Sequence, residues 1–128
     1  MSVLGHGIDI VECHRIAKVW ENHGQRFLDR ILTPQEQERA KLYTKNPTPF
    51  VAGRWAAKEA VLKMIGTGWR GRISWKDIEV LPDELGQPVV TLGGETARLA
   101  DQMGIKRVLL SITHTNEHAV ASAIGLAG

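Results

Sequence analysis

The chain has 128 residues, of which 43% are hydrophobic and 23% charged, a balance that is ordinary for a soluble globular protein. This length predicts a single domain spanning residues 1–128. The one cysteine, Cys13, excludes an internal disulfide and a four-thiolate metal site. No apolar run approaches the length of a membrane span, and the N-terminus lacks the apolar core of a signal peptide. We therefore expect a cytoplasmic protein with no membrane partner.

The net charge is only +2, but the charges are unevenly distributed along the chain. Residues 54–76 contain six Lys or Arg and one acid, whereas residues 77–101 contain six acids and one Arg. Local potential steers association, so the basic segment favours an anionic ligand. A solvated basic face, balanced by its acidic neighbour, is the alternative.

Hydrophobic periodicity and turn residues divide the chain into short elements. In chain order they are a strand at 3–12, helices at 14–22, 34–43 and 50–65, strands at 77–81 and 89–92, a helix at 95–103, and strands at 108–114 and 118–124. The segment 26–32 has recurring apolar pairs but is assigned to neither type. The order β-α-α-α-β-β-α-β-β predicts an α+β domain with a mainly antiparallel sheet packed on one long central helix.

The first predicted strand carries an acid in its most apolar part. Asp9 lies between Ile8 and Ile10, and Gly5 and Gly7 interrupt the strand before it. Asp is depleted in strands and is rarely buried without a partner. Asp9 is therefore an edge or turn residue unless a second carboxylate can reach it.

Two of the predicted helices have clear boundary signals. Thr33, Pro34 and Glu36 supply an N-cap, a proline at N1 and an acid at N3, which together predict a capping box. The central helix follows two prolines and precedes the turn Gly66-Thr67-Gly68.

The central helix carries charges on a stripe that is otherwise apolar or small. At 100° per residue the stripe consists of Ala52, Trp55, Ala56, Glu59 and Lys63. We expect this stripe to face the interior, where charges need partners. Glu59 and Lys63 are then either an internal ion pair that satisfies itself or a charged site that binds an ion or an anion.

Asp9 and Glu59 are two interior-facing carboxylates from different elements. Such hard oxygen ligands suit magnesium, which accepts one or two carboxylates and takes its other ligands from water and phosphate. Lys63, one turn after Glu59, could contact the same phosphate. The turn Gly66-Thr67-Gly68 could bring backbone N–H groups close to it, although glycine after a helix is usually a C-cap.

The segment His114-Thr-Asn-Glu117-His118 matches the H-x-x-E-H pattern of inverted zinc peptidases. That chemistry needs a helix, whereas the preceding residues alternate as a strand does and Asn116-Glu117 resembles a hairpin tip. We interpret His118 as a strand or turn residue. His114, at a strand end, is the better candidate for a hydrogen bond to an anion or a substrate.

Residues 69–76 interleave aromatic and basic side chains, namely Trp69, Arg70, Arg72, Trp75 and Lys76. This interleaving is typical of proteins that bind single-stranded nucleic acid. A small RNA- or DNA-binding module is therefore an alternative hypothesis. The structural alternative is that these tryptophans are core or interface anchors.

Four segments, taken together, resemble one known family. They are Gly7 to Glu12, Arg26 to Thr33 with Glu36, Phe50 to Lys63 with its Arg-Trp-Ala-Ala-Lys-Glu-Ala centre, and Ser111 to Thr115. In this order they resemble the holo-(acyl-carrier-protein) synthases, the small bacterial class of 4′-phosphopantetheinyl transferases. The resemblance covers nearly the whole chain.

The resemblance implies a 4′-phosphopantetheinyl transferase-like fold and a magnesium-dependent reaction in fatty acid biosynthesis. In it, 4′-phosphopantetheine passes from coenzyme A to a serine of apo acyl carrier protein, giving holo carrier protein and adenosine 3′,5′-bisphosphate. It further implies that Asp9 and Glu59 hold magnesium, with the coenzyme A pyrophosphate completing the coordination. A homotrimer with active sites at subunit boundaries is also implied, and no nucleic-acid partner.

The resemblance also suggests roles for particular residues. Asp9, Glu59 and Lys63 would form the catalytic set, with Glu59 or a metal-bound water as the base for the carrier serine. Beside Lys63, we expect further contacts to coenzyme A from Arg54, Gly66, Thr67, Gly68, Ser111, His114 and Thr115, with Gly86 and Pro88 reaching the nucleotide from a neighbouring subunit. The acidic carrier protein is expected to dock on Arg15, Arg26 and Arg30, with Phe27 as an apolar anchor.

Overall fold

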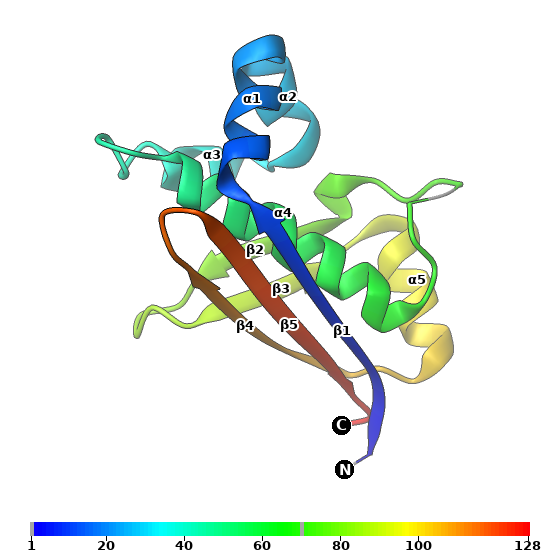
Figure 1. Cartoon of the computed structure of the whole chain (residues 1–128). Coiled ribbons are helices and arrows are strands. Elements are labelled where there is room, and N and C mark those ends of the chain that lie inside the picture. Colours follow the sequence, from blue (N-terminus) through cyan, green and yellow to red (C-terminus); the bar gives the residue numbers. More distant parts are fainter. Residues whose placement is uncertain (1, 70) are drawn as a thin grey trace.

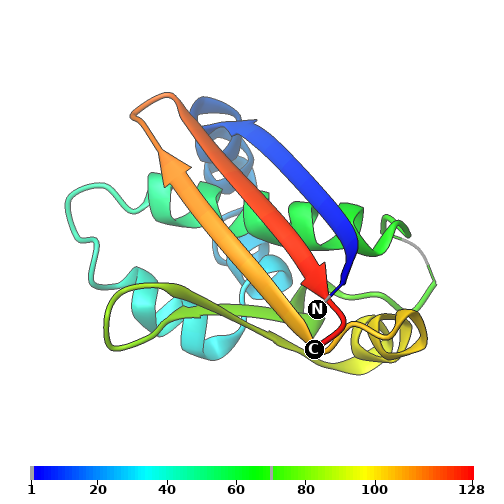
Figure 2. The ribbon, with the colours of Figure 1, turned by 90° about the horizontal axis from the view of Figure 1, so that it is seen from below.

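An antiparallel three-stranded sheet and one long helix organise the fold in the computed structural model, which describes residues 2–69 and 71–128. The sheet has the strand order β1-β5-β4, and helix α4 packs across one of its faces (Figure 1). These elements are β1 (Val3–Glu12), β4 (Arg107–His114), β5 (His118–Leu126) and α4 (Thr48–Ile65). Seen from below, all three strands cross over α4 (Figure 2).

The remaining elements surround the other sides of α4. They are α1 (Cys13–His23), α2 (Gln25–Ile31), α3 (Pro34–Ala40), the 3₁₀ turn η1 (Trp75–Asp77), the antiparallel pair β2 (Ile78–Pro82) and β3 (Pro88–Leu92), and α5 (Gly94–Met103). The α+β class and the packing on a long central helix are thus confirmed. The strands, however, form two antiparallel sheets. No helix in the described part of the chain is long and apolar enough to cross a membrane.

One segment left unassigned by the sequence is helical, and one predicted helix end needs correction. The unassigned segment 26–32 is largely helical, because α2 begins directly after Gly24, whose φ of 57° breaks the chain away from α1. The third helix was predicted to reach Tyr43, but its α-helical bonding ends at Ala40. The N–H groups of Lys41 to Tyr43 instead donate to carbonyls three residues earlier, so the helix closes in a tighter turn.

The predicted capping box at the start of α3 is confirmed. Thr33 Oγ1 accepts from the Glu36 N–H at 3.2 Å, and Glu36 Oε1 accepts from the Thr33 N–H at 2.8 Å. The box also has a second use, because the Glu36 side chain is fully buried. It therefore brings a carboxylate into the core next to α4.

The predicted interior stripe of α4 is wrong for its charged members. Ala52 and Ala56 are buried, but Glu59 is half-buried and the Lys63 side chain is 53% exposed. The cation that enters the core is Lys58, with no exposed surface. Because α4 packs on the sheet on one side and on helices and β2 on others, it has no single buried face.

Strand β1 approaches α4 unusually closely, and two glycines make this possible. A Cβ at Gly7 would lie 2.0 Å from the Ala60 carbonyl oxygen, and one at Gly5 would lie 2.3 Å from that of Met64. Both obstacles are backbone atoms, which cannot move aside. The residues that interrupt the predicted strand are therefore the surface on which strand and helix meet.

No helix or strand that the structure describes covers the opposite face of the three-stranded sheet (Figure 2). Strand pairing aligns Ile8 with Ser122 and Ser111, Ile10 with Val120 and Thr113, and His6 with Ile124 and Leu109, all on this outer face. Ile8 is 57% and Ile10 64% exposed. Leu109 on the same face is 44% exposed, so the face combines exposed apolar side chains with polar ones, as interaction sites do.

Candidate functional site

Asp9 and Lys63 meet where β1 crosses α4. Lys63 Nζ donates to Asp9 Oδ1 at 2.9 Å and to the Ile8 carbonyl oxygen at 3.1 Å. The Asp9 side chain is 14% exposed and that of Lys63 is 53% exposed. The self-satisfying pair of Glu59 with Lys63, one of the two sequence interpretations, is therefore not what the structure shows, because the lysine reaches across to the strand.

Glu59 lies one turn before Lys63 on the same helix. Its Oε1 accepts a hydrogen bond from Trp69 Nε1 at 2.9 Å. Among the described residues, Asp9 Oδ2 and Glu59 Oε2 receive no hydrogen bond. Each carboxylate is thus held by one oxygen and has its second oxygen available to a ligand.

The donor set fits a hard divalent cation that is only partly coordinated by protein. Within residues 2–69 and 71–128 there is no cluster of three or more His, Cys, Asp or Glu side chains that could hold a metal. A pair of carboxylates from two elements is the usual protein contribution to a magnesium site, where water and phosphate supply the other ligands. Asp9 on β1 and Glu59 on α4, one turn before the lysine that contacts Asp9, offer two such carboxylates.

The H-x-x-E-H segment forms a hairpin, as the alternation of its residues predicts. His114 is the last residue of β4 and His118 the first of β5. Thr115 Oγ1 accepts from the N–H groups of Glu117 and His118, both at 3.1 Å, and so closes the turn. The helical geometry that a zinc peptidase needs is absent from this segment.

A second ion pair on α4 was not predicted from the sequence. Lys58 Nζ donates to Glu36 Oε1 at 2.7 Å, and both side chains are 0% exposed. The same ammonium donates to the carbonyl oxygens of Ile31 at 2.6 Å and Trp75 at 3.1 Å. Burial lowers the pKa of Lys58, and the neighbouring Glu36 carboxylate opposes that shift. The pair ties α2, α3 and η1 to the helix that carries the site.

The tryptophans after α4 pack against one another. The rings of Trp69 and Trp75 are stacked with centroids 3.8 Å apart, and Trp75 lies 4.4 Å from Trp55 on α4. Phe27 continues the row at 6.0 Å from Trp55. These faces are engaged by other rings, which favours the core-anchor interpretation over stacking on nucleic-acid bases. Arg70, part of that alternative hypothesis, lies outside the described residues.

A pocket of about 440 Å³ lies between the predicted docking surface and Glu59, and neither Asp9 nor Lys63 lines it. Arg26 and Arg30 of α2 line it together with Glu59, and its aromatic wall consists of Phe27, Trp55, Trp69 and Trp75. Phe27 is only 6% exposed, so it forms the pocket wall and does not project as an anchor. The third predicted docking residue, Arg15, is exposed on α1.

Four of the predicted coenzyme A contacts lie on α4 or directly after it: Arg54 within the helix, and Gly66, Thr67 and Gly68 in the turn that follows. Arg54 Nε donates to the Val80 carbonyl oxygen at 3.2 Å and its guanidinium covers the Phe50 ring. Burial lowers the pKa of Arg54. After α4, Gly66 has a φ of 90° and serves as the C-cap, while Thr67 and Gly68 complete an exposed turn.

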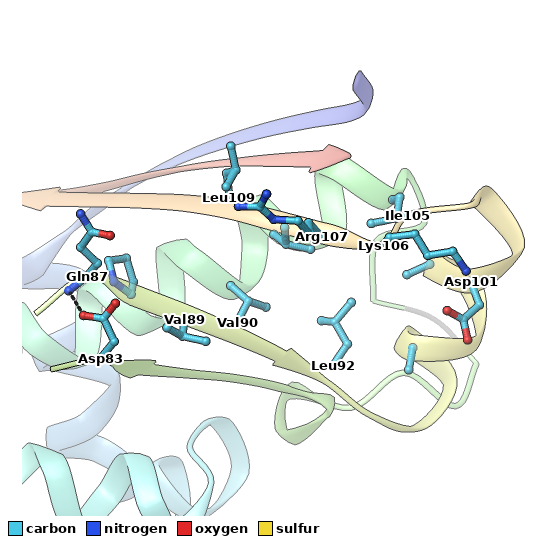
Figure 3. Close-up of a pocket in the computed structure, with 14 residues that line it drawn as sticks. Asp83, Gln87, Val89, Val90, Leu92, Asp101, Ile105, Lys106, Arg107 and Leu109 are labelled. Atoms are coloured by element: carbon cyan, nitrogen blue, oxygen red, sulfur yellow. Dashed lines mark hydrogen bonds between the residues drawn. The ribbon is translucent and has the colours of Figure 1, made fainter. Parts of the chain in front are cut away.

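None of the predicted coenzyme A contacts lines the pocket that contains Glu59, and the remaining ones lie on other elements. Gly86 lies in the exposed β2–β3 turn, and Pro88 borders a cavity of about 600 Å³ between β3 and β4. Figure 3 shows this cavity, with Gln87 at one end and Lys106 toward the other. On β4, Ser111 belongs to the uncovered outer face, whereas His114 is on the alternate side of the strand. Pro88 and Ser111 therefore lie on surfaces other than the pocket of Glu59.

Comparison with known proteins places these features in a family context. Residues 5–123 match the family model described as the 4′-phosphopantetheinyl transferase superfamily. A relative from Natranaerobius thermophilus, named holo-[acyl-carrier-protein] synthase, is 45% identical over 123 residues, covering 95% of this chain and 96% of the relative.

Solved structures agree with the sequence relatives. The crystal structure of holo-[acyl-carrier-protein] synthase from Neisseria meningitidis has a TM-score of 0.88 and 35% identity, covering 98% of this chain and 99% of that one. The holo-(acyl-carrier-protein) synthase from Bacillus anthracis, solved in complex with CoA (3′,5′-ADP), has a TM-score of 0.81 and 40% identity, with 98% of both chains covered.

Proposed function

The chain belongs to the 4′-phosphopantetheinyl transferase superfamily, and we propose that it transfers 4′-phosphopantetheine from coenzyme A to a serine of apo acyl carrier protein. The products are holo carrier protein and adenosine 3′,5′-bisphosphate. The observation that carries this proposal is the meeting of Asp9 and Lys63, next to Glu59, at the crossing of β1 and α4. The solved relative that contains coenzyme A supports it as the donor.

We propose that Asp9 and Glu59 hold magnesium, one from each element. When bound, the ion supplies charge neutralisation for the pyrophosphate and for the leaving bisphosphate. Lys63 already holds Asp9 Oδ1, and with half of its side chain exposed it can direct its ammonium to the same phosphate oxygens. Positioning and charge, not a covalent intermediate, are what these three side chains provide.

The pocket gives the carrier protein a path to Glu59. Arg26 and Arg30 are exposed at its rim, and Arg15 is exposed on the neighbouring helix α1, so an acidic partner meets positive charge there. A serine presented at this rim would approach the Glu59 carboxylate along the aromatic wall. We place this reaction in fatty acid biosynthesis and in the cytoplasm, a reducing compartment that agrees with the single buried Cys13.

We propose further that the chain is a homotrimer with its active sites between subunits. The uncovered apolar face with Ile8 and Ile10 supplies a surface for a second copy. The proposal would also account for Pro88, Ser111 and His114, which lie away from the Glu59 pocket of their own chain. A neighbouring copy would bring its own set of these residues to that pocket.

Mass spectrometry of apo acyl carrier protein incubated with this protein, coenzyme A and magnesium tests the reaction. The phosphopantetheine mass increment should appear with wild type and should disappear with a chelator or with Asp9→Asn. No increment with a carrier that another transferase can load would contradict the proposal.

A complementation experiment tests the shared site. Asp9→Asn and His114→Ala should each be inactive alone. If each site combines Asp9 from one subunit with His114 from another, mixing and reassembling the two variants should restore part of the activity. A mixture that sediments as a trimer but stays inactive would contradict the shared site.

A further inference from the structure

Trp69 is the residue outside the predicted site that touches it most directly. It lies in the loop after α4, ten positions beyond Glu59, and its Nε1–H donates to Glu59 Oε1 at 2.9 Å. A carboxylate oxygen that accepts an N–H is a charge-assisted acceptor with a preferred direction. This contact therefore restricts how the Glu59 carboxylate can rotate.

The ring of Trp69 is held in place by a row of stacked tryptophans that leads back to Trp55 of α4. Trp69 stacks on Trp75 with a centroid distance of 3.8 Å and an interplanar angle of 27°. Trp75 in turn packs on Trp55 of α4, and its carbonyl oxygen accepts from the buried Lys58 at 3.1 Å. The indole that donates to Glu59 is therefore stacked on Trp75, and the Trp75 backbone is hydrogen-bonded to the buried Lys58.

We propose that Trp69 is a positioning residue for the metal site, an inference that rests on the proposed function. Its N–H holds Oε1 of Glu59 and leaves Oε2, which receives no hydrogen bond from the described residues, as the oxygen that would bind the metal. Groups that hydrogen-bond to a ligating carboxylate change metal affinity by about 10- to 100-fold when removed. The same ring forms part of the pocket wall, so the loop that carries Trp69 joins the metal site to the path of the carrier protein.

The test uses Trp69→Phe, which keeps an aromatic ring in the stack and removes the N–H. Trp75→Phe is the matched control, because it also replaces an indole in the stack but retains the backbone carbonyl bonded to Lys58 and the Trp69 N–H. Mn²⁺ is titrated into each protein in the presence of coenzyme A, and free Mn²⁺ is followed by electron paramagnetic resonance. Thermal unfolding of each variant checks the fold.

We expect Trp69→Phe to weaken Mn²⁺ binding by about tenfold or more, and Trp75→Phe to change it by less than about threefold. At saturating Mn²⁺ the transfer rate of Trp69→Phe should approach that of the wild type. The KM of this variant for the carrier protein should equal the wild-type value. In a Glu59→Ala background, which removes the acceptor of the Trp69 N–H, Trp69→Phe should have no further effect on metal binding, since the two changes act on one contact.

Equal weakening by Trp69→Phe and Trp75→Phe, or unchanged Mn²⁺ binding by a folded Trp69→Phe, would overturn the positioning role. These outcomes differ from failure of the proposed function. In that case the wild-type protein itself would show no metal-dependent transfer to a competent carrier, whatever residue stands at position 69.

Discussion

Helix α4 carries two lysines, five residues apart, that form ion pairs of nearly equal length and opposite character. Lys58 lies 2.7 Å from Glu36, with both side chains completely buried. Lys63 lies 2.9 Å from Asp9, with side-chain exposures of 53% and 14%. Distance alone does not distinguish the two pairs, whereas their surroundings do.

We call the buried Lys58–Glu36 pair closed, because every hydrogen of its ammonium has an acceptor in the protein, and the partly exposed Lys63–Asp9 pair open. The ammonium of Lys58 has three acceptors, a carboxylate and two carbonyls, which equals the number of its hydrogens. It has nothing left to offer a ligand, and removing either partner strands a charge in the core. The Lys63 pair is weakly stabilising because water reaches its ammonium, and under the proposed function this ammonium would exchange Asp9 for a phosphate.

The largest expected effect follows from breaking the closed pair. Lys58→Met should lower the free energy of unfolding by about 3–5 kcal/mol, because Glu36 stays buried without its cation. Lys63→Met should lower it by no more than about 1 kcal/mol. Urea unfolding of the two variants measures both values, and equal losses would remove the distinction between the pairs.

Asp9→Asn should give the reverse pattern. The loss of one carboxylate from the proposed metal site should slow transfer at least about a hundredfold, since a bound metal contributes several kcal/mol of charge stabilisation. The free energy of unfolding should change by less than about 1 kcal/mol, because the pair it breaks is partly exposed. The initial rate of bisphosphate release measures transfer, and the midpoint of urea unfolding measures stability. A strongly destabilised Asp9→Asn would show that the open pair is structural.

Gly7→Ala tests whether the open pair depends on the close approach of β1 to α4. The added methyl would meet the Ala60 carbonyl oxygen, so we expect a loss of about 1–3 kcal/mol from overpacking. Because the strand must move away from the helix, Asp9 should separate from Lys63 and transfer should fall as well. Unfolding and rate measurements on one preparation check this. A variant with wild-type values in both would mean that the strand accommodates a side chain here.

The smallest effect concerns a buried group that becomes charged with rising pH. Cys13 is 4% exposed, and burial raises the pKa of its thiol above the ordinary 9.0. Between pH 9.0 and that raised pKa the unfolded chain releases the proton while the folded chain retains it, so the unfolding free energy falls as pH rises. Cys13→Ala should lack this part of the decrease. Urea midpoints at pH 7 and above pH 9 measure it, and identical pH slopes would exclude Cys13 as a cause.

Local signals in the sequence were sufficient for most of the fold. Alternation and turn residues located the strands, and the capping box at Thr33 and Glu36 is formed as predicted. Asp9 drew attention because an acid is out of place in an apolar strand. The contact of Asp9 with Lys63 was not predicted, because Lys63 was paired with Glu59 or with a phosphate.

The sequence could not reveal which charges on α4 are buried, because a helical wheel assumes one buried face. The partner of Lys58 is Glu36, 22 residues earlier, and only tertiary packing brings them together. The bond from Trp69 to Glu59 likewise depends on how a loop turns back over its helix. A lysine within an alanine-rich stretch of helix was the one available signal for the buried pair.

The pairing of β1 with β5 also bears on when the site can form during synthesis. Asp9 is aligned with Ala121, on a strand that follows every other element in the chain. A nascent chain that still lacks residues 118–126 has no central strand on which β1 can align, even though Asp9, Glu59 and Lys63 have all been translated. Ribosome-bound fragments should therefore remain unable to bind the donor substrate until β5 emerges, because such long-range pairing forms late.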